Sequence, residues 1–171
     1  MNRSVTAVPI TVLALIAAVP IFAQGQKQPP TPAQSIRGQF GYVNGKVLEM
    51  AKDFPEDKYG FKLKPEMRSF GEVIVHVHSG IVYAAKVGRG EKASWDEVDP
   101  KTLPTKAAIV AAVEKSLNDA TAVLQSTPDD HFKETLAPWL SVIEHSAEHY
   151  GLLVAYYRAN GMVPPESRPK K

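Results

Sequence analysis

The sequence predicts an all-α protein, a four-helix bundle, from three observations. Apolar residues recur at steps of three and four through four long segments, as on one face of a helix. None of these segments shows the strict alternation of apolar and polar residues that is typical of a strand. Segments rich in Gly and Pro separate the four helices, and the connection between the second and third is long enough to be a crossover.

The chain is predicted to begin with an export signal, residues 1–23. Arg3 provides a basic start, an uncharged apolar run follows, and Ala23 is a small residue of the kind that precedes signal cleavage. The alternative is a retained membrane anchor, but Pro9 and Pro20 interrupt the apolar run. We therefore expect an exported protein, periplasmic or secreted, with no membrane association after cleavage.

The first predicted helix follows a polar linker at residues 24–34, which we expect to be disordered, and ends before Pro55. Its apolar residues form one seam: Ile36, Phe40, Val43, Val47, Met50 and Phe54. Gly38, Gly41 and Gly45 lie within this helix, and each costs about 1 kcal/mol of helix propensity relative to Ala. We expect the close approach of a neighbouring helix or a ligand to compensate for that cost.

The second and third helices are predicted at residues 69–86 and 105–125, joined by the crossover of residues 88–104. A short turn is expected in this crossover around Trp95. The inward residues of the second helix are expected to be Phe70, Val73, Ile74, Val77 and Ile81. Those of the third are expected to be Val110, Val113, Leu117, Ala120 and Leu124.

The fourth helix is expected to run from near Pro138, or a few residues earlier, to Asn160, with Gly161 as its C-terminal cap. Two apolar stripes follow it: Val142, His145, His149, Leu152 and Tyr156 on one side, Ile143, Ala147, Tyr150, Val154 and Tyr157 on the other. A helix that is apolar on two sides is covered on two sides, which predicts a homodimer. The bundle is then residues 35–166, followed by a basic tail at residues 167–171.

Composition excludes several classes of function. The chain has no cysteine, so catalysis by a protein thiolate and attachment through a lipidated cysteine are both excluded. Its 20 basic and 18 acidic residues are scattered along the chain. Binding of nucleic acid requires a clustered basic surface, and we expect no such partner.

The histidines are the strongest indication of chemistry. His145 and His149 are four residues apart, so on a helix they lie on the same face and can bind one divalent metal ion. His76 and His78 are about 200° apart around the second helix, so only one of them can join this pair. His76 lies beside the inward seam, and Gly80 one turn later leaves room for a ligand or another helix. His78 is then expected at the surface or at an interface.

A site of three histidines suits Zn²⁺, Ni²⁺, Fe²⁺ or Mn²⁺ and keeps at least one coordination position open. The alternative is that the histidines are hydrogen-bonded core residues. Ser146 stands where a zincin peptidase has its catalytic Glu, and Glu144 and Glu148 are expected to point away from the neighbouring histidines. Glu72, one turn before His76, is a candidate proton acceptor, and the alternative is an ordinary surface Glu.

Four stretches together follow the pattern of a known family: FPEDKY at 54–59, MRSFGE at 67–72 with His76-Val77 after it, HSAEHYG at 145–151 and YRANGMVPP at 157–165. They resemble DinB-like (DinB/YfiT) proteins, and the resemblance covers about residues 35–166. It implies an up-down-down-up bundle whose divalent metal is held by one histidine of the second helix and the H-x3-H pair of the fourth. The matching residues here are His76, His145 and His149.

The resemblance also implies a function. Characterised relatives include transferases and isomerases that use low-molecular-weight thiols, which are cytosolic, whereas this chain carries an export signal. Leu152 stands where relatives commonly have Gln or Asn. We therefore predict a metal-dependent enzyme, a hydrolase or thiol transferase, acting on a small molecule that the sequence does not identify. The alternative is a non-catalytic exported module that binds a metal and dimerises.

Overall fold

The computed structural model describes residues 29–169, and the four long helices of this part of the chain pack into one bundle. The helices are α1 (Pro32–Asp53), α2 (Phe70–Gly88), α3 (Lys106–Ser126) and α4 (Phe132–Ala159). The predicted all-α four-helix bundle is thereby confirmed. The expected export signal lies outside the described residues. No helix within residues 29–169 is long and apolar enough to cross a membrane.

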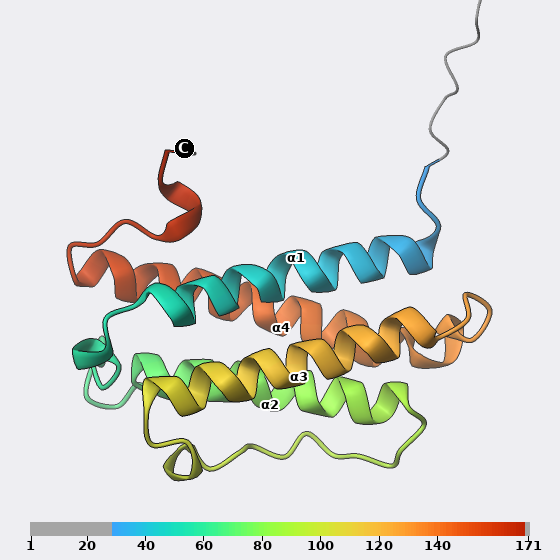
Figure 1. Cartoon of the computed structure of the whole chain (residues 1–171), viewed down its shortest axis with the longest axis horizontal. Coiled ribbons are helices and arrows are strands. Elements are labelled where there is room, and N and C mark those ends of the chain that lie inside the picture. The colour runs from blue at the N-terminus through green and yellow to red at the C-terminus, as the bar shows by residue number, and fades with distance from the viewer. Residues whose placement is uncertain (1–28, 170–171) are drawn as a thin grey trace, which may run out of the picture.

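The helices have the up-down-down-up arrangement (Figure 1). Helices α1 and α4 run in one direction, and α2 and α3 run in the other. Each of α1 and α2 packs against both α3 and α4, so α1 and α2 lie diagonally opposite. Because α2 and α3 are parallel neighbours, the chain between them must return along the length of the bundle, which explains the long crossover.

Two helices begin with a capping box, in which each of two residues, three positions apart, accepts a hydrogen bond with its side chain from the backbone amide of the other. Thr31 accepts a hydrogen bond from the amide of Gln34, and the Gln34 side chain accepts one from the amide of Thr31. Ser69 and Glu72 form the same arrangement at the start of α2. As a result α1 already begins at Pro32, and residues 32–34, predicted as linker, form its first turn.

Aromatic rings fill one end of the bundle core. Phe54 and Phe70 stack with their ring centroids 3.8 Å apart, and Tyr157 packs edge-on against Phe54 at 5.0 Å. All five residues predicted to face inward on α2 are fully buried. The burial of such rings contributes most to the stability of a small bundle.

Helix α3 is turned slightly from its predicted orientation. Its buried residues are Ile109, Val113, Ser116, Ala120, Val123 and Leu124. Val110 and Leu117, which were expected to face inward, are only partly buried. The polar Ser116 lies on the buried seam because it has a hydrogen-bond partner on α2, and a seam chosen by apolarity alone passes over it.

One further expectation is wrong, namely that a neighbouring helix approaches the glycines of α1. No atom from beyond the local backbone comes within 4 Å of a β-carbon placed at Gly38, Gly41 or Gly45, so no helix approaches them. These glycines face the outside of α1, and nothing in the bundle compensates for their low helix propensity. The short turn expected around Trp95 is present, because the Asp96 amide donates a 3.0 Å hydrogen bond to the Ser94 backbone oxygen. The crossover also contains a 3₁₀ helix at Pro100–Thr102.

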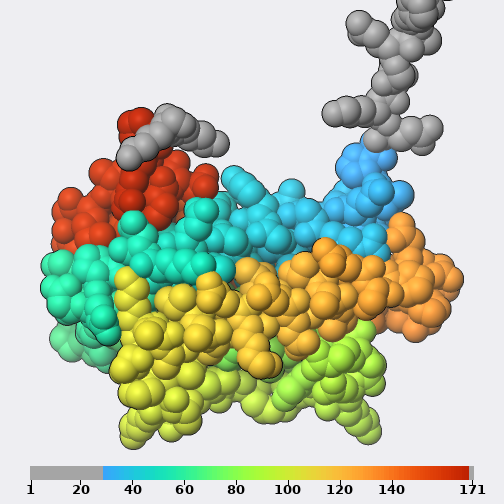
Figure 2. Space-filling model, in the orientation of Figure 1, coloured from blue at the N-terminus to red at the C-terminus, as the bar shows by residue number. Residues whose placement is uncertain are grey.

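The chain after α4 folds back onto α1 (Figure 2). Gly161 ends α4 with φ of +69°, the left-handed conformation that glycine adopts without strain. The guanidinium of Arg168 then donates two hydrogen bonds to the Asp53 carboxylate, at 2.8 and 2.6 Å. The predicted tail at residues 167–171 is therefore attached to the bundle at Arg168.

Candidate metal centre

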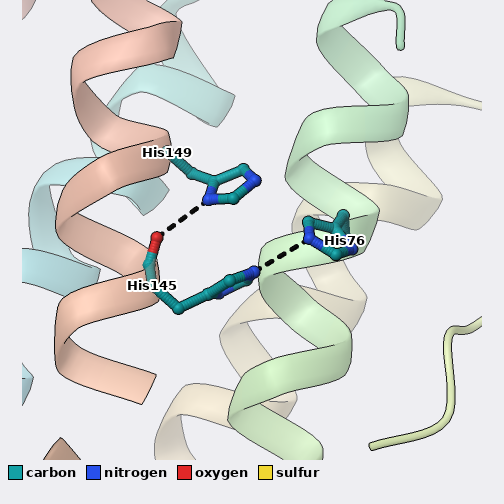
Figure 3. Close-up of side chains that lie close together, drawn as sticks. All are labelled: His76, His145 and His149. Carbon is teal, nitrogen blue, oxygen red and sulfur yellow. Dashed lines mark hydrogen bonds between the residues drawn. The ribbon is translucent and has the colours of Figure 1, made fainter. Parts of the chain in front are cut away.

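Three histidine side chains converge between α2 and α4 (Figure 3). His76 projects from α2, while His145 and His149 project from successive turns of α4. One ring nitrogen from each lies within 4.8 Å of the others, and the Nε2 atoms of His76 and His145 are 2.9 Å apart. The structure thus brings together the three residues that the sequence predicted, and leaves each of them partly buried.

A buried polar contact on the side of α4 that faces α1 fixes the direction of its histidines. Ser146, fully buried, donates a hydrogen bond of 2.8 Å to the side-chain oxygen of Asn44 on α1. The Asn44 amide donates in turn to the backbone oxygen of Phe40, at 2.9 Å. Rotation of α4 would leave both polar groups buried without partners, which is costly. The residue that replaces the zincin Glu therefore has a structural role.

The second nitrogen of each ring has a different environment. Nδ1 of His149 donates to the backbone oxygen of His145 at 2.9 Å, so in the neutral tautomer with this bond Nε2 is the nitrogen that can bind a metal. Nδ1 of His76 lies 2.8 Å from the Glu97 carboxylate, but the ring N–H is not aimed along this contact, which is therefore mainly electrostatic. Nδ1 of His145 is buried and has no hydrogen-bond partner among the described residues.

Burial favours the neutral form of His145 and of His76. It lowers the pKa of His145 to about 4, and the neighbouring His149 and His76 lower it further in the same direction. Burial also lowers the pKa of His76, assisted by Arg68 and opposed by Glu97. A metal ligand must present an unprotonated nitrogen, so this environment suits metal binding at neutral pH.

The three residues fit a divalent cation. Two unprotonated Nε2 atoms directed at one another at 2.9 Å would repel, so in the metal-free protein one of them must carry a proton. A cation between them removes that conflict. Two imidazole nitrogens on one tetrahedral zinc ion are about 3.4 Å apart, a separation that small ring rotations reach from the observed geometry.

A cavity of about 380 Å³ opens beside the histidines. It is lined by His76, Trp95, Ser141, Glu144, His145 and Glu148. Glu144 and Glu148, which were expected to point away from the neighbouring histidines, are both among the residues that line this cavity. Their helical position explains this, since residues 141, 144, 145 and 148 are three or four apart and share one face of α4.

A second cavity, of about 440 Å³, lies on the other side of His149. Its lining includes Arg68 from the segment before α2, and Leu152 and Tyr156 from α4. Leu152, the position where relatives commonly have a polar residue, therefore gives this wall an apolar surface.

The crossover forms the outer wall of the first cavity. The ring of Trp95 packs edge-on against His145, with centroids 4.8 Å apart, and stacks on Tyr83 at 5.1 Å. A β-carbon at Gly80 would lie 2.4 Å from the Trp95 ring. The space that was expected to receive a ligand or a helix at Gly80 is therefore occupied by Trp95.

Glu72 lies away from the converging histidines. Its carboxylate accepts a 2.6 Å hydrogen bond from the Ser69 amide, which lowers its pKa, and it lies 3.5 Å from the Lys62 ammonium. It lines a different cavity, next to Tyr59 and Lys106. The carboxylate caps α2, and its predicted role as a proton acceptor stays a prediction.

His78 is in the interior and not at the surface. It is 9% exposed, and its Nδ1 lies 2.9 Å from the hydroxyl of Ser116 on α3. Since this hydroxyl donates to the backbone oxygen of Val113, it accepts from His78. The angular argument that separated His78 from the other histidines was correct, but α3 covers the face on which it lies.

Sequence reasoning missed Trp95 and Glu97, the two crossover residues beside the histidines. They lie in an irregular segment, where no periodicity indicates which side chains turn inward. Gly80 gave an indirect signal, because a glycine inside a helix often marks a close approach. The S-x-x-E pattern of residues 69–72 was a readable signal for Glu72, since it is the signature of a capping box.

Comparison with known families agrees with this geometry. The sequence model of the DinB superfamily matches residues 39–156, a span that includes all three histidines and most of the bundle. This chain belongs to the DinB superfamily. No curated protein matches it. The family assignment made from the sequence motifs is thereby confirmed.

Proposed function

We propose that this DinB-superfamily protein is an exported metal-dependent enzyme. It holds one divalent cation, Zn²⁺, Ni²⁺, Fe²⁺ or Mn²⁺, through His76, His145 and His149. The observation that carries this proposal is the convergence of three imidazoles, with one ring nitrogen from each within 4.8 Å of the others, beside an open cavity. Three protein ligands are the number found in catalytic zinc sites, whereas closed structural sites have four.

The cavity supports a small-molecule substrate. Its volume of about 380 Å³ is at the lower end of the range of ligand sites. A bound cation supplies Lewis acidity, which lowers the pKa of water or of a thiol and polarises a substrate oxygen. The indole of Trp95 offers an apolar wall, Ser141 offers a hydroxyl, and Glu144 and Glu148 are carboxylates that can accept a proton. Hydrolysis and thiol transfer both fit these groups.

Two parts of the proposal rest on other observations. Export rests on the signal-like composition of residues 1–23 and places the protein in the periplasm or outside the cell. A homodimer is supported by exposed apolar side chains on α1 and α4, since Tyr42 is 60% exposed and Leu140 is 47% exposed.

Elemental analysis of the untagged, signal-processed protein tests the metal site. We expect one metal ion per chain in the wild type and none in the His145→Ala/His149→Ala variant. His131→Ala, which removes an exposed histidine before α4, is the matched control and should keep full occupancy. Full occupancy in the double variant, or no metal in the wild type after incubation with Zn²⁺, Ni²⁺ and Mn²⁺, would contradict the proposal.

A second measurement distinguishes an enzyme from a non-catalytic module. In Co²⁺-substituted protein, an open coordination position should let a small thiol or hydroxamate change the visible absorption spectrum. A spectrum that does not respond to either probe would indicate a closed site, in which the metal only stabilises the bundle.

A further inference from the structure

We propose that Glu97, on the crossover, is a positioning residue for the metal centre. Its carboxylate holds the proton of His76 on Nδ1 and thereby presents an unprotonated Nε2 toward His145 and His149. This inference rests on the proposed function, because the ring orientation of His76 matters for metal binding only if the three histidines bind a metal.

The Glu97 carboxylate contacts two groups at the site. Its Oε1 lies 2.8 Å from His76 Nδ1 and 2.8 Å from the guanidinium of Arg68. Arg68 is itself tied to α4, because the hydroxyl of Tyr156 donates to its backbone oxygen. Glu97 therefore joins His76 of α2 to a residue that is fixed on α4.

The crossover around Glu97 is held in place although it has no regular structure. On one side, Trp95 packs into the space that Gly80 leaves on α2. On the other side, the amide of Val98 donates a 3.0 Å hydrogen bond to the hydroxyl of Ser79, also on α2. These two contacts flank Glu97 and keep its backbone beside His76, so its carboxylate reaches the ring although the side chain is 51% exposed.

A carboxylate in this position has a known physical effect on a metal-binding histidine. The ring nitrogen that does not bind the metal donates its N–H to an acceptor, and that acceptor determines the tautomer and the orientation of the ring. His149 already has such an acceptor in a backbone oxygen. For His76 the corresponding group is Glu97. The 2.8 Å separation of Nδ1 and the carboxylate oxygen is a hydrogen-bond distance, and a rotation that directs the N–H along it would complete the bond.

The competing explanation is that Glu97 only forms a surface ion pair with Arg68. Such a pair would contribute little to stability and would have no influence on the tautomer of His76. The tautomer is therefore the quantity that separates the two explanations. It can be measured in the metal-free protein, without reference to any activity.

The test uses ¹⁵N NMR of the metal-free, full-length mature protein at a pH where the imidazoles are neutral. In the wild type, the His76 ring should carry its proton on Nδ1. Glu97→Ala should give a mixture of both tautomers. Glu97→Gln should restore the wild-type tautomer, because its amide oxygen can accept the same hydrogen bond. Asp96→Asn is the matched control, since Asp96 is the adjacent carboxylate and bonds to Ser94.

Zinc affinity, measured by competition with a chelator, provides the second readout. Glu97→Ala should weaken zinc binding about 10- to 100-fold, the usual effect of losing such a partner, and Asp96→Asn should leave the affinity unchanged. A wild-type His76 protonated on Nε2, or a Glu97→Ala variant with unchanged tautomer and unchanged affinity, would overturn the inference. If the wild type binds no metal at all, the proposed function fails, and the NMR result alone decides the role of Glu97.

Discussion

Helix α2 contributes one histidine to each of its two neighbours, and the two interfaces are built differently. His78 lies between α2 and α3, where the Ser116 hydroxyl accepts a hydrogen bond from its Nδ1 and donates one to the backbone oxygen of Val113. His76 lies between α2 and α4, where it faces two other imidazoles beside an open cavity. At the α2–α3 interface the polar groups form hydrogen bonds with one another, whereas at the α2–α4 interface ring nitrogens remain available to bind a metal ion.

This difference shows that the environment, and not the residue type, makes a histidine a ligand candidate. Both rings are neutral, because burial lowers the pKa of His76 and of His78. Only the α2–α4 interface has converging nitrogens, and the second nitrogen of one of these rings, Nδ1 of His145, has no hydrogen-bond partner within residues 29–169. Buried polar groups without partners are rare in proteins and often mark functional sites.

The largest expected effect is the loss of metal binding when the histidine of one interface, and not that of the other, is replaced. His76→Ala should abolish metal binding, because two histidines remain and the site loses a ligand from α2. His78→Asn should leave the metal content unchanged, since the Asn amide can still donate to Ser116. Elemental analysis and chelator competition on both variants check this. Loss of metal in His78→Asn, with circular dichroism unchanged, would mean that the two interfaces are not independent.

The second prediction concerns the crossover wall. Gly80→Ala places a β-carbon 2.4 Å from the Trp95 ring, so we expect the indole to be displaced and stability to fall by about 1 to 3 kcal/mol. Gly41→Ala on α1 is the control. It meets no other atom and should stabilise the protein by about 0.5 to 1 kcal/mol.

Tryptophan fluorescence and urea unfolding report on this pair of variants. Trp139 is fully buried, so a red shift of the emission on Gly80→Ala would come from Trp95. An unshifted emission together with a stability gain equal to that of Gly41→Ala would show that Trp95 does not form the cavity wall.

The sequence was sufficient for the fold and for the three histidines because both depend on helical periodicity. The spacing of four residues places His145 and His149 on one face, and the seam of α2 selects His76 over His78. Periodicity also located α3 and three residues of its buried seam, but it selected Leu117 in place of Ser116 because a seam chosen by apolarity passes over a polar residue. Only the partner on α2 explains why a polar residue is buried there.

Helical periodicity could not predict which side chains outside the helices approach the site. Trp95 and Glu97 lie on the crossover, and their approach to the site depends on tertiary contacts with Gly80, Ser79 and Arg68. Such contacts join residues that are distant in sequence and leave no periodic pattern in it.

The third prediction tests the hydrogen bond between His78 and Ser116 at the α2–α3 interface. Ser116→Ala leaves the buried Nδ1–H of His78 without an acceptor, which should cost about 1 to 2 kcal/mol in urea unfolding. Because this interface is separate from the cavity, zinc affinity should stay the same. A His78→Leu/Ser116→Ala variant removes both polar groups and should recover most of the lost stability. If the double variant is as unstable as the single one, packing and not hydrogen bonding explains the effect.

The smallest expected effect is a pH dependence that both interfaces share. Burial holds the pKa of His78, and of His76 and His145, below the unfolded value of about 6.5. The unfolded chain then binds more protons than the folded protein as the pH falls below about 6.5, so the stability of the metal-free protein should decrease there.

The His78→Asn variant separates the contribution of the α2–α3 interface to this dependence of stability on pH from that of the α2–α4 interface. It removes one depressed histidine, so its stability should depend less steeply on pH between about 7 and 5 than that of the wild type. Carboxylates such as Asp53 and Glu97, whose pKa values lie below the usual range, lose their stabilising charge only at lower pH and do not obscure this window. The measurement is urea unfolding in the presence of a chelator across this range. An identical slope in both proteins would place the whole pH dependence in the α2–α4 interface, where His76 and His145 face one another.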